Sequence, residues 1–134
     1  MSSANAETVR RLLQSVNEGN LDAALRELHR DARLDWSGSE APDSGVYDGH
    51  AGWLEWITGR REDLGYVRFE ATDIVEQPPN TVVTEVTVQS RGRASGAETV
   101  SVGAAVWTVH DGKVATMTLY QTREDALKAA GLDE

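Results

Sequence analysis

The sequence predicts an α+β fold in which three helices cover one face of a bent antiparallel sheet. In the first half of the chain, apolar residues recur at the three- and four-residue spacing of amphipathic helices. In the second half, apolar and polar residues alternate as they do in half-buried strands. The apolar face of so long a sheet must be covered, and the early helices are available for it. Such a sheet wrapped on helices forms a cone whose open end would admit a ligand.

Four segments are expected to be helical. In the first, apolar residues recur at helical spacing from Val9 to Val16, and Gly19 suits the left-handed residue that ends a helix. In the third, Gly52 and Gly59 lie near tryptophans although glycine weakens a helix, which predicts that another segment packs against the backbone there. The expected helices span residues 4–17, 21–29, 50–64 and 123–130.

The strands are expected as one short strand and a four-strand meander. In the first strand of the meander, Ile74 and Val75 break the alternation, which predicts a β-bulge. The expected strands span residues 33–36, 66–77, 81–89 and the two arms of a hairpin over 98–121.

The hairpin over 98–121 is expected to form the floor of a pocket. A three-residue loop ending at Gly112, with this glycine at positive φ, sets the register. One face then carries small apolar residues, with Trp107 at one end and a polar pair, Ser101 and Gln121, at the other. The expected cross-strand pairs are Val109–Lys113, Trp107–Ala115, Ala105–Met117, Gly103–Leu119 and Ser101–Gln121.

Length and composition limit the classes of protein to which the chain can belong. The 134 residues suffice for one domain, expected over 1–134, that buries about two thirds of its unfolded surface. No apolar run approaches the roughly 18 residues of a membrane span, and the first residues lack the pattern of a signal peptide. The absence of cysteine fits a reducing compartment, and we expect a cytoplasmic location.

Charge and residue spacing exclude further classes. The formal net charge of −9 repels phosphate backbones, so nucleic acid is not an expected partner, although solubility alone also explains the acidity. No spacing of His, Asp and Glu resembles a metal site, and we expect neither a metal nor another cofactor.

Six short segments carry a family resemblance. They are NEGNLD (17–22), DARLDW (31–36), GSE (38–40) with SG (44–45), YDGH (47–50), VWTVHDGKV (106–114) and REDAL (123–127). In these segments the chain resembles the nuclear-transport-factor-2-like (NTF2-like) superfamily, and within it the SnoaL-like and ketosteroid-isomerase-like proteins. The resemblance implies an NTF2-like cone with a short C-terminal helix. It is a poor guide to activity, because this fold hosts isomerases, cyclases, dehydratases, epoxide hydrolases and non-enzymatic binders.

The resemblance also implies what the chain lacks. Leu12, Trp36 and Ala105 match the positions where ketosteroid isomerases carry a tyrosine, a general-base aspartate and a protonated aspartic acid. None of the three can do that chemistry, so a standard ketosteroid isomerase is not expected. Polyketide-cyclase relatives use a His and an Asp from the last two strands, where this chain offers Ala105 and Gln121.

Two residues remain as catalytic candidates. Asp35 is the carboxylate nearest to the family's base, but alternation places its side chain opposite Trp36, where pairing with an arginine is the alternative. His50 is expected in the first turn of a helix, where the helix dipole disfavours imidazolium and a neutral ring could accept a proton. The alternative is a half-exposed histidine beside a capping turn.

The four tryptophans are expected to be core residues that also line the pocket. Each indole N–H requires a partner, which Ser101 or Gln121 could supply. Such a pocket suits a flat apolar molecule with one polar end, of aromatic, terpenoid or polyketide-like type. The expected ligand-binding residues are Trp36, Tyr47, Trp53, Trp56, Ser101, Ala105, Trp107, Met117, Leu119 and Gln121.

Two functions therefore stay open from the sequence. One is a cofactor-independent isomerase, cyclase or dehydratase in which Asp35 or His50 moves a proton while Gln121 or an indole N–H steadies oxyanion charge. The other is a non-catalytic binding or accessory domain.

The face of the sheet opposite the expected pocket is too apolar to remain exposed to solvent. The superfamily commonly dimerises there, so we expect a homodimer through Val102, Ala104, Val106, Thr108 and Tyr120.

Overall fold

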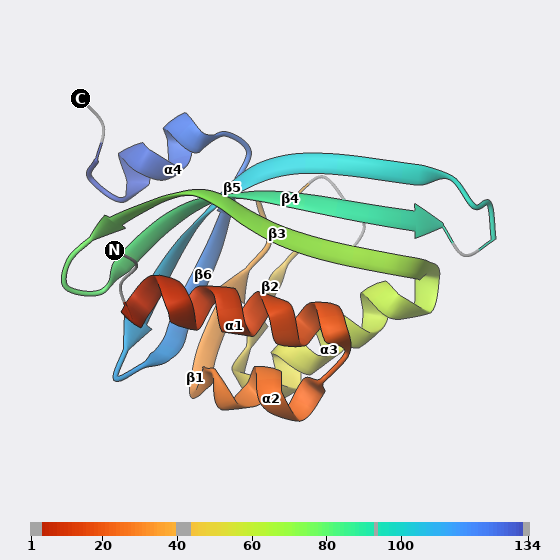
Figure 1. Ribbon diagram of the computed structural model, residues 1–134, viewed down its shortest axis with the longest axis horizontal. Coiled ribbons are helices and arrows are strands. Elements are labelled where there is room, and N and C mark those ends of the chain that lie inside the picture. Colours follow the sequence, from red (N-terminus) through yellow and green to blue (C-terminus); the bar gives the residue numbers. More distant parts are fainter. Residues whose placement is uncertain (1–3, 40–43, 93, 133–134) are drawn as a thin grey trace.

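The structure describes residues 4–39, 44–92 and 94–132, without the side chains of 60–66. Within these residues the computed structural model has four helices and six strands (Figure 1). The helices are α1 (Ala4–Glu18), α2 (Leu21–Arg26), α3 (Gly49–Asp63) and α4 (Arg123–Ala129). The strands are β1 (Leu28–Asp35), β2 (Val46–Asp48), β3 (Leu64–Gln77), β4 (Thr81–Gly92), β5 (Glu98–His110) and β6 (Lys113–Tyr120).

All six strands form one bent sheet in the order β2-β1-β6-β5-β4-β3. Neighbouring strands are antiparallel except β1 and β6, which run parallel. Figure 1 shows α1, α2 and α3 on one side of this sheet and α4 on the other. We call the side under α1–α3 the concave face and the side under α4 the convex face. The expected α+β cone, with its meander and short C-terminal helix, is confirmed.

The strands at one end of the sheet differ from expectation. The second helix was expected to reach residue 29, but α2 ends at Arg26 and Leu28 already pairs with Val114 of β6. The Val114 N–H also donates to the Glu27 carbonyl at 2.8 Å. Pairing with a distant strand thus outweighs the local helical pattern, and β1 is eight residues long. Strand β2, which pairs with β1, was not expected at all.

The β5–β6 turn is shorter than expected, which corrects the hairpin register. Asp111 (φ 53°) and Gly112 (φ 77°) form a two-residue turn, and His110 pairs with Lys113. Positive φ at both central residues is what a tight hairpin turn requires. A bulge at Ala115 follows, between the pairs Val109–Val114 and Thr108–Thr116.

The new register keeps most of the expected face. Trp107 pairs with Met117 and Ala105 with Leu119, two residues away from the expected partners. Because side chains alternate, a shift of two leaves them all on the same face. Near the turn, Lys113 had been expected beside Val109. Because of the bulge, Val114 is buried there and the charged Lys113 is exposed to solvent.

Two local predictions in β3 and α3 can be scored. The β3 bulge is confirmed by a register shift between Thr72 and Val75 and by positive φ at Asp73. Close packing at Gly52 is also confirmed, since a Cβ there would lie 2.9 Å from the Tyr47 carbonyl carbon. The same prediction for Gly59 is wrong, because nothing in the described part of the chain lies within 4 Å of a Cβ built there.

The sheet carries a hydrophobic core on each face. The concave core joins α1, α2 and α3 to the sheet. The smaller convex core is formed by Val83, Ala104 and Ala126, and Tyr120 and Leu127 pack at its margin. Helix α4 therefore covers part of the face that was expected to be a dimer surface. None of the helices in the described residues is both long and apolar enough to span a membrane.

Candidate functional site

Four aromatic side chains meet on the concave face, and we call them the aromatic cluster: Trp36, Trp53, Trp56 and Phe69. Trp56 is its centre. Its ring centroid lies 4.9 Å from that of Trp36, 5.3 Å from that of Phe69 and 6.4 Å from that of Trp53. The interplanar angles of 41° to 80° are those of tilted and edge-to-face pairs, which are worth about 0.5–1.5 kcal/mol each beyond area burial. At most 4% of any of the four residues is exposed.

Backbone contacts hold two of these tryptophans in place. Trp36 follows β1, and its N–H donates to the Gly45 carbonyl at 2.7 Å. Trp53 lies on the inner side of α3, and its indole N–H donates to the Ala32 carbonyl of β1 at 3.1 Å. The aromatic cluster is therefore tied to β1 from two directions.

The expected pocket floor lies beside this cluster in the concave core. Trp107, Ala105 and Met117 are buried there with Leu12 of α1. The Trp107 indole N–H donates to the buried hydroxyl of Thr84 at 3.0 Å, so its partner is a β4 residue. Tyr47 and Leu119 are half-buried and pack against the same core.

The expected polar pair does not form. Ser101 is exposed and lies opposite Val88 of β4. Gln121 lies just beyond the end of β6, is exposed, and donates from Nε2 to the Gly38 carbonyl. The physical reason is the hairpin register, since the two-residue shift moves Gln121 toward Gly103 and away from Ser101.

Asp35 lies on the sheet face opposite to the aromatic cluster. Its carboxylate accepts hydrogen bonds from the Ser37 N–H at 3.1 Å and the Ser37 hydroxyl at 2.5 Å. On the same face, a hydrogen bond from Arg33 to Asp48 at 2.8 Å raises the pKa of Arg33, and the charge of Asp35 raises it further. Asp35 therefore lies on the face opposite Trp36, as alternation predicted, but the hydrogen bonds that it accepts come from Ser37, while Arg33 pairs with Asp48.

His50 is half-buried in the first turn of α3. Its Nε2 lies 3.2 Å from the Leu28 carbonyl, which can only accept a hydrogen bond, so Nε2 carries the proton. In the tautomer that carries its proton on Nε2, Nδ1 is a hydrogen-bond acceptor. Asp35 and Leu28 lie at opposite ends of β1. The structure does not bring the two catalytic candidates together.

The interior of the described molecule carries little chemistry for proton transfer. Among the described residues, the buried polar side chains are Thr8 and Thr84, and neither is ionisable. Within the same residues, no three His, Asp or Glu side chains gather as a metal-binding group. The concave core is built of apolar side chains and aromatic rings.

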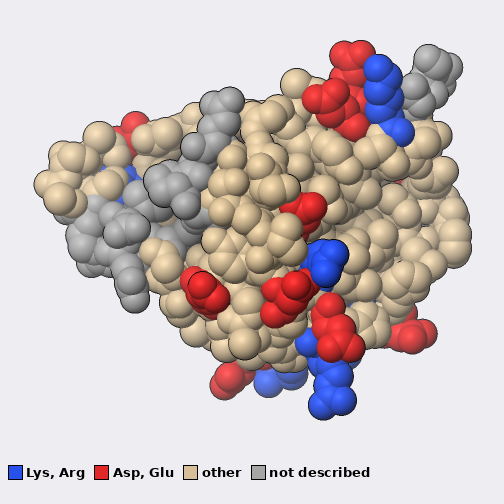
Figure 2. All heavy atoms as spheres, turned by 180° about the vertical axis from the view of Figure 1, so that it is seen from behind, with Lys and Arg blue, Asp and Glu red and all other residues tan. Residues whose placement is uncertain are grey.

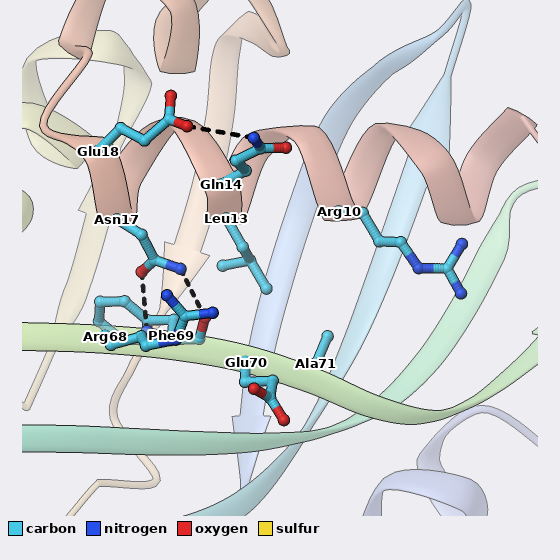
Figure 3. A pocket seen from close by; sticks show the side chains of 9 residues that line it. All are labelled: Arg10, Leu13, Gln14, Asn17, Glu18, Arg68, Phe69, Glu70 and Ala71. Atoms are coloured by element: carbon cyan, nitrogen blue, oxygen red, sulfur yellow. Dashed lines mark hydrogen bonds between the residues drawn. The ribbon is translucent and has the colours of Figure 1, made fainter.

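A groove of about 430 Å³ lies outside the cone, between α1 and β3 (Figure 3). Leu13 points from α1 toward β3, and Glu70 points away from the helix. At one end, Asn17 forms two hydrogen bonds with the backbone of Phe69. The lining residues are Arg10, Leu13, Gln14, Asn17, Glu18, Arg68, Phe69, Glu70 and Ala71.

Asn17 and Phe69 were not identified as site residues from the sequence. One signal was present, because Asn17 lies four residues after Leu13 and so places an amide on the apolar stripe of α1. Phe69 lies within the expected strand over residues 66–77, where no local pattern connects it to the tryptophans.

The rear surface of the molecule is unevenly charged (Figure 2). Acidic and basic side chains gather over α4 and along the lower edge of this view, while much of the remaining surface shows neither. The first turn of α4 carries Glu124 and Asp125.

Comparison with known proteins adds a family and a set of similar folds. The model of the SnoaL-like domain family matches residues 9–117. No curated protein matches the chain. The TerC structure co-crystallised with polyporic acid is 22% identical, with a TM-score of 0.77 over 97% of this chain and 98% of that chain.

Two further structures are similar. An NTF2-like protein of unknown function from Burkholderia pseudomallei K96243 is 19% identical, with a TM-score of 0.76 over 95% of this chain and 97% of that chain. Rv0760c from Mycobacterium tuberculosis, in complex with estradiol-17β-hemisuccinate, is 10% identical, with a TM-score of 0.77 over 89% of this chain and 94% of that chain. At these identities the likeness concerns the fold.

Proposed function

Because this chain belongs to the SnoaL-like domain family, as its motifs indicated, we propose that it binds a flat, apolar small molecule on its concave face. The observation that carries the proposal is the aromatic cluster, in which Trp56 contacts three other rings. Aromatic side chains contribute large apolar contact areas and favour ring-shaped ligands. Two proteins of similar fold were crystallised with ring molecules that carry polar groups, polyporic acid and estradiol-17β-hemisuccinate.

The expected ligand-binding residues divide into three groups under this proposal. The aromatic cluster supplies the stacking surface. Buried Ala105, Trp107 and Met117 shape the floor behind it. We propose half-buried Tyr47 and Leu119, with exposed Ser101 and Gln121, as the residues that meet the polar end of a ligand.

We further propose that binding, without proton transfer, is the function of this site. Asp35 faces away from the cluster and is engaged by Ser37, and no described ionisable side chain is buried. Acid–base catalysis needs a group within hydrogen-bond reach of the substrate. The described part of the concave core offers no such group.

The binding proposal is tested by titrating the purified protein with polyporic acid and with estradiol-17β-hemisuccinate while recording heat by calorimetry and tryptophan emission. We expect saturable binding of at least one compound. Trp56→Leu, which removes the central ring, should weaken binding by about tenfold or more. Val83→Ala, in the convex core, is the matched control for lost stability and should bind as the wild type does. No saturable binding, or equal affinity in Trp56→Leu, would contradict the proposal.

One observation favours a second candidate, a cofactor-independent isomerase, cyclase or dehydratase. The hydrogen bond from His50 Nε2 to the Leu28 carbonyl leaves Nδ1 as a proton acceptor in the neutral ring. If His50 is a general base, it should catalyse exchange of a ligand C–H proton in D₂O, measured by NMR. His50→Gln should abolish this exchange. Exchange at the uncatalysed rate in the wild-type protein supports the binding function.

We propose that two copies associate through the uncovered part of the convex face. Val102 and its neighbour Val100 are 57% and 63% exposed, which is high for valine on a sheet. Ala104 is buried, while Val106, Thr108 and Tyr120 are half-buried. Light scattering at micromolar protein should give the mass of a dimer, and Val102→Lys should give that of a monomer. A monomeric mass for the wild type would contradict this interface.

A further inference from the structure

The side-chain amide of Asn17 pairs with both backbone polar groups of one residue. Its Nδ2 donates to the Phe69 carbonyl, its Oδ1 accepts from the Phe69 N–H, and both distances are 2.8 Å (Figure 3). Strand β3 is an edge of the sheet, so the backbone groups that point away from β4 have no neighbouring strand. A carboxamide offers one donor and one acceptor side by side, as a strand does. Asn17 therefore takes the place of a missing strand at Phe69.

The other side of Phe69 belongs to the aromatic cluster. Its ring is inside the concave core, 4% exposed, and lies 5.3 Å from the ring of Trp56. Trp56 in turn contacts Trp36 and Trp53. Because interiors are close-packed, a displacement of the Phe69 backbone moves its ring against Trp56.

Apolar packing and hydrogen bonding both hold β3 against α1 here, since Leu13, Val16 and Phe69 belong to one hydrophobic core. The groove between Arg10 and Leu13 on the helix and Glu70 and Ala71 on the strand separates the two elements right beside Phe69. At the other end of the same edge, Asn5 donates a single hydrogen bond to the Pro79 carbonyl at 2.8 Å. The two hydrogen bonds of Asn17 are thus a directional contact that ties the backbone of Phe69 to α1.

We propose that Asn17 is a positioning residue for the ligand site: it places the Phe69 ring and, through it, the aromatic cluster. The effect on ligand affinity rests on the proposed function. The effect on the geometry of the rings does not, because it follows from contacts within the chain.

The test compares Asn17→Ala with Asn5→Ala, which removes an amide from the same helix without touching Phe69. Asn17→Asp is a second variant that keeps an acceptor for the Phe69 N–H and loses the donor to its carbonyl. Near-UV circular dichroism in the tryptophan bands reports the arrangement of the rings. Denaturant titration gives the folded fraction, and calorimetry with polyporic acid and estradiol-17β-hemisuccinate gives the affinity.

We expect Asn17→Ala, under conditions where it is folded, to lose near-UV intensity and to bind about tenfold more weakly or worse. Asn17→Asp, which places a carboxylate oxygen opposite the Phe69 carbonyl, should also lose near-UV intensity and affinity, and Asn5→Ala should match the wild type in both readouts. A wild-type near-UV spectrum in Asn17→Ala would overturn the proposal. If Asn17→Ala does not fold, a wild-type near-UV spectrum and a wild-type affinity in Asn17→Asp would overturn the proposal. If the wild type binds neither compound, the proposed function fails, and the near-UV comparison still decides the role of Asn17.

Discussion

Two glycines of α3 give a sharp prediction, because alanine should act in opposite directions at the two positions. Alanine favours a helix interior over glycine by about 1 kcal/mol. At Gly59 no atom of the described side chains or backbone lies within 4 Å of an added Cβ, so this gain should be fully realised. At Gly52 the added Cβ would lie 2.9, 3.2 and 3.3 Å from the Tyr47 carbonyl carbon, Cα and Cβ.

The contacts at Gly52 decide the sign of its effect. Carbon atoms prefer a separation of about 3.5–4.0 Å, and two of the three atoms met are backbone of β2, which must move as a whole. Such overpacking costs about 1–3 kcal/mol, which exceeds the helical gain. We therefore expect Gly52→Ala to destabilise the protein by about 1 kcal/mol and Gly59→Ala to stabilise it by about 1 kcal/mol.

The assay is chemical and thermal unfolding followed by tryptophan emission, because all four tryptophans are buried in the folded chain. For a chain of 134 residues, 1 kcal/mol corresponds to a change in Tm of about 4 °C. The two variants should therefore differ from each other by about 8 °C. If Gly52→Ala were as stable as Gly59→Ala, the close approach of α3 and β2 would be refuted.

Three further substitutions test single contacts. Thr84→Val removes the acceptor of the Trp107 indole N–H and should lower the free energy of unfolding by about 1–3 kcal/mol in a denaturant titration. Thr84→Ser keeps a hydroxyl and should retain most of this stability. Equal losses in the two variants would contradict the hydrogen bond. Thr122→Ala removes the side-chain cap of α4 and should cost about 1 kcal/mol, with Thr122→Ser as control; an unchanged midpoint would show that the cap is not formed. Because Asp48 raises the pKa of Arg33, this guanidinium is charged in both folded and unfolded chains below strongly alkaline pH, where its contribution would be lost. Arg33→Gln should therefore lower the free energy of unfolding by the same amount at every pH between about 6 and 9. A loss that varies across this range would contradict the pairing of Arg33 with Asp48.

Local patterns in the sequence predicted the elements and their inner faces well. Alternation correctly placed Trp107, Ala105 and Met117 together on the concave face, although the predicted partners were wrong. The break in alternation at Ile74 correctly predicted a bulge. These features depend on neighbours two to four residues away, which is the range over which side-chain direction repeats.

These local patterns did not predict the contacts between segments that are distant in the sequence. The pairing of β1 with β6 turned the expected helical residue Leu28 into strand. A two-residue turn at Asp111 and Gly112 moved Gln121 away from Ser101 and removed the expected polar pair. The packing of α4 buried Ala104 on a face expected to be open.

For the candidate site too, some features follow from the sequence and others only from the tertiary structure. By itself, the sequence determined an acidic α+β chain of the SnoaL-like family with an apolar concave face. Periodicity and residue chemistry depend on residues close together in the sequence, so they can be recognised without coordinates. Only the tertiary structure decided that Phe69 completes the aromatic cluster and that the amide of Asn17 holds its backbone. These two residues are 52 positions apart, and what joins them is the unpaired edge of β3, which exists only once the sheet has formed.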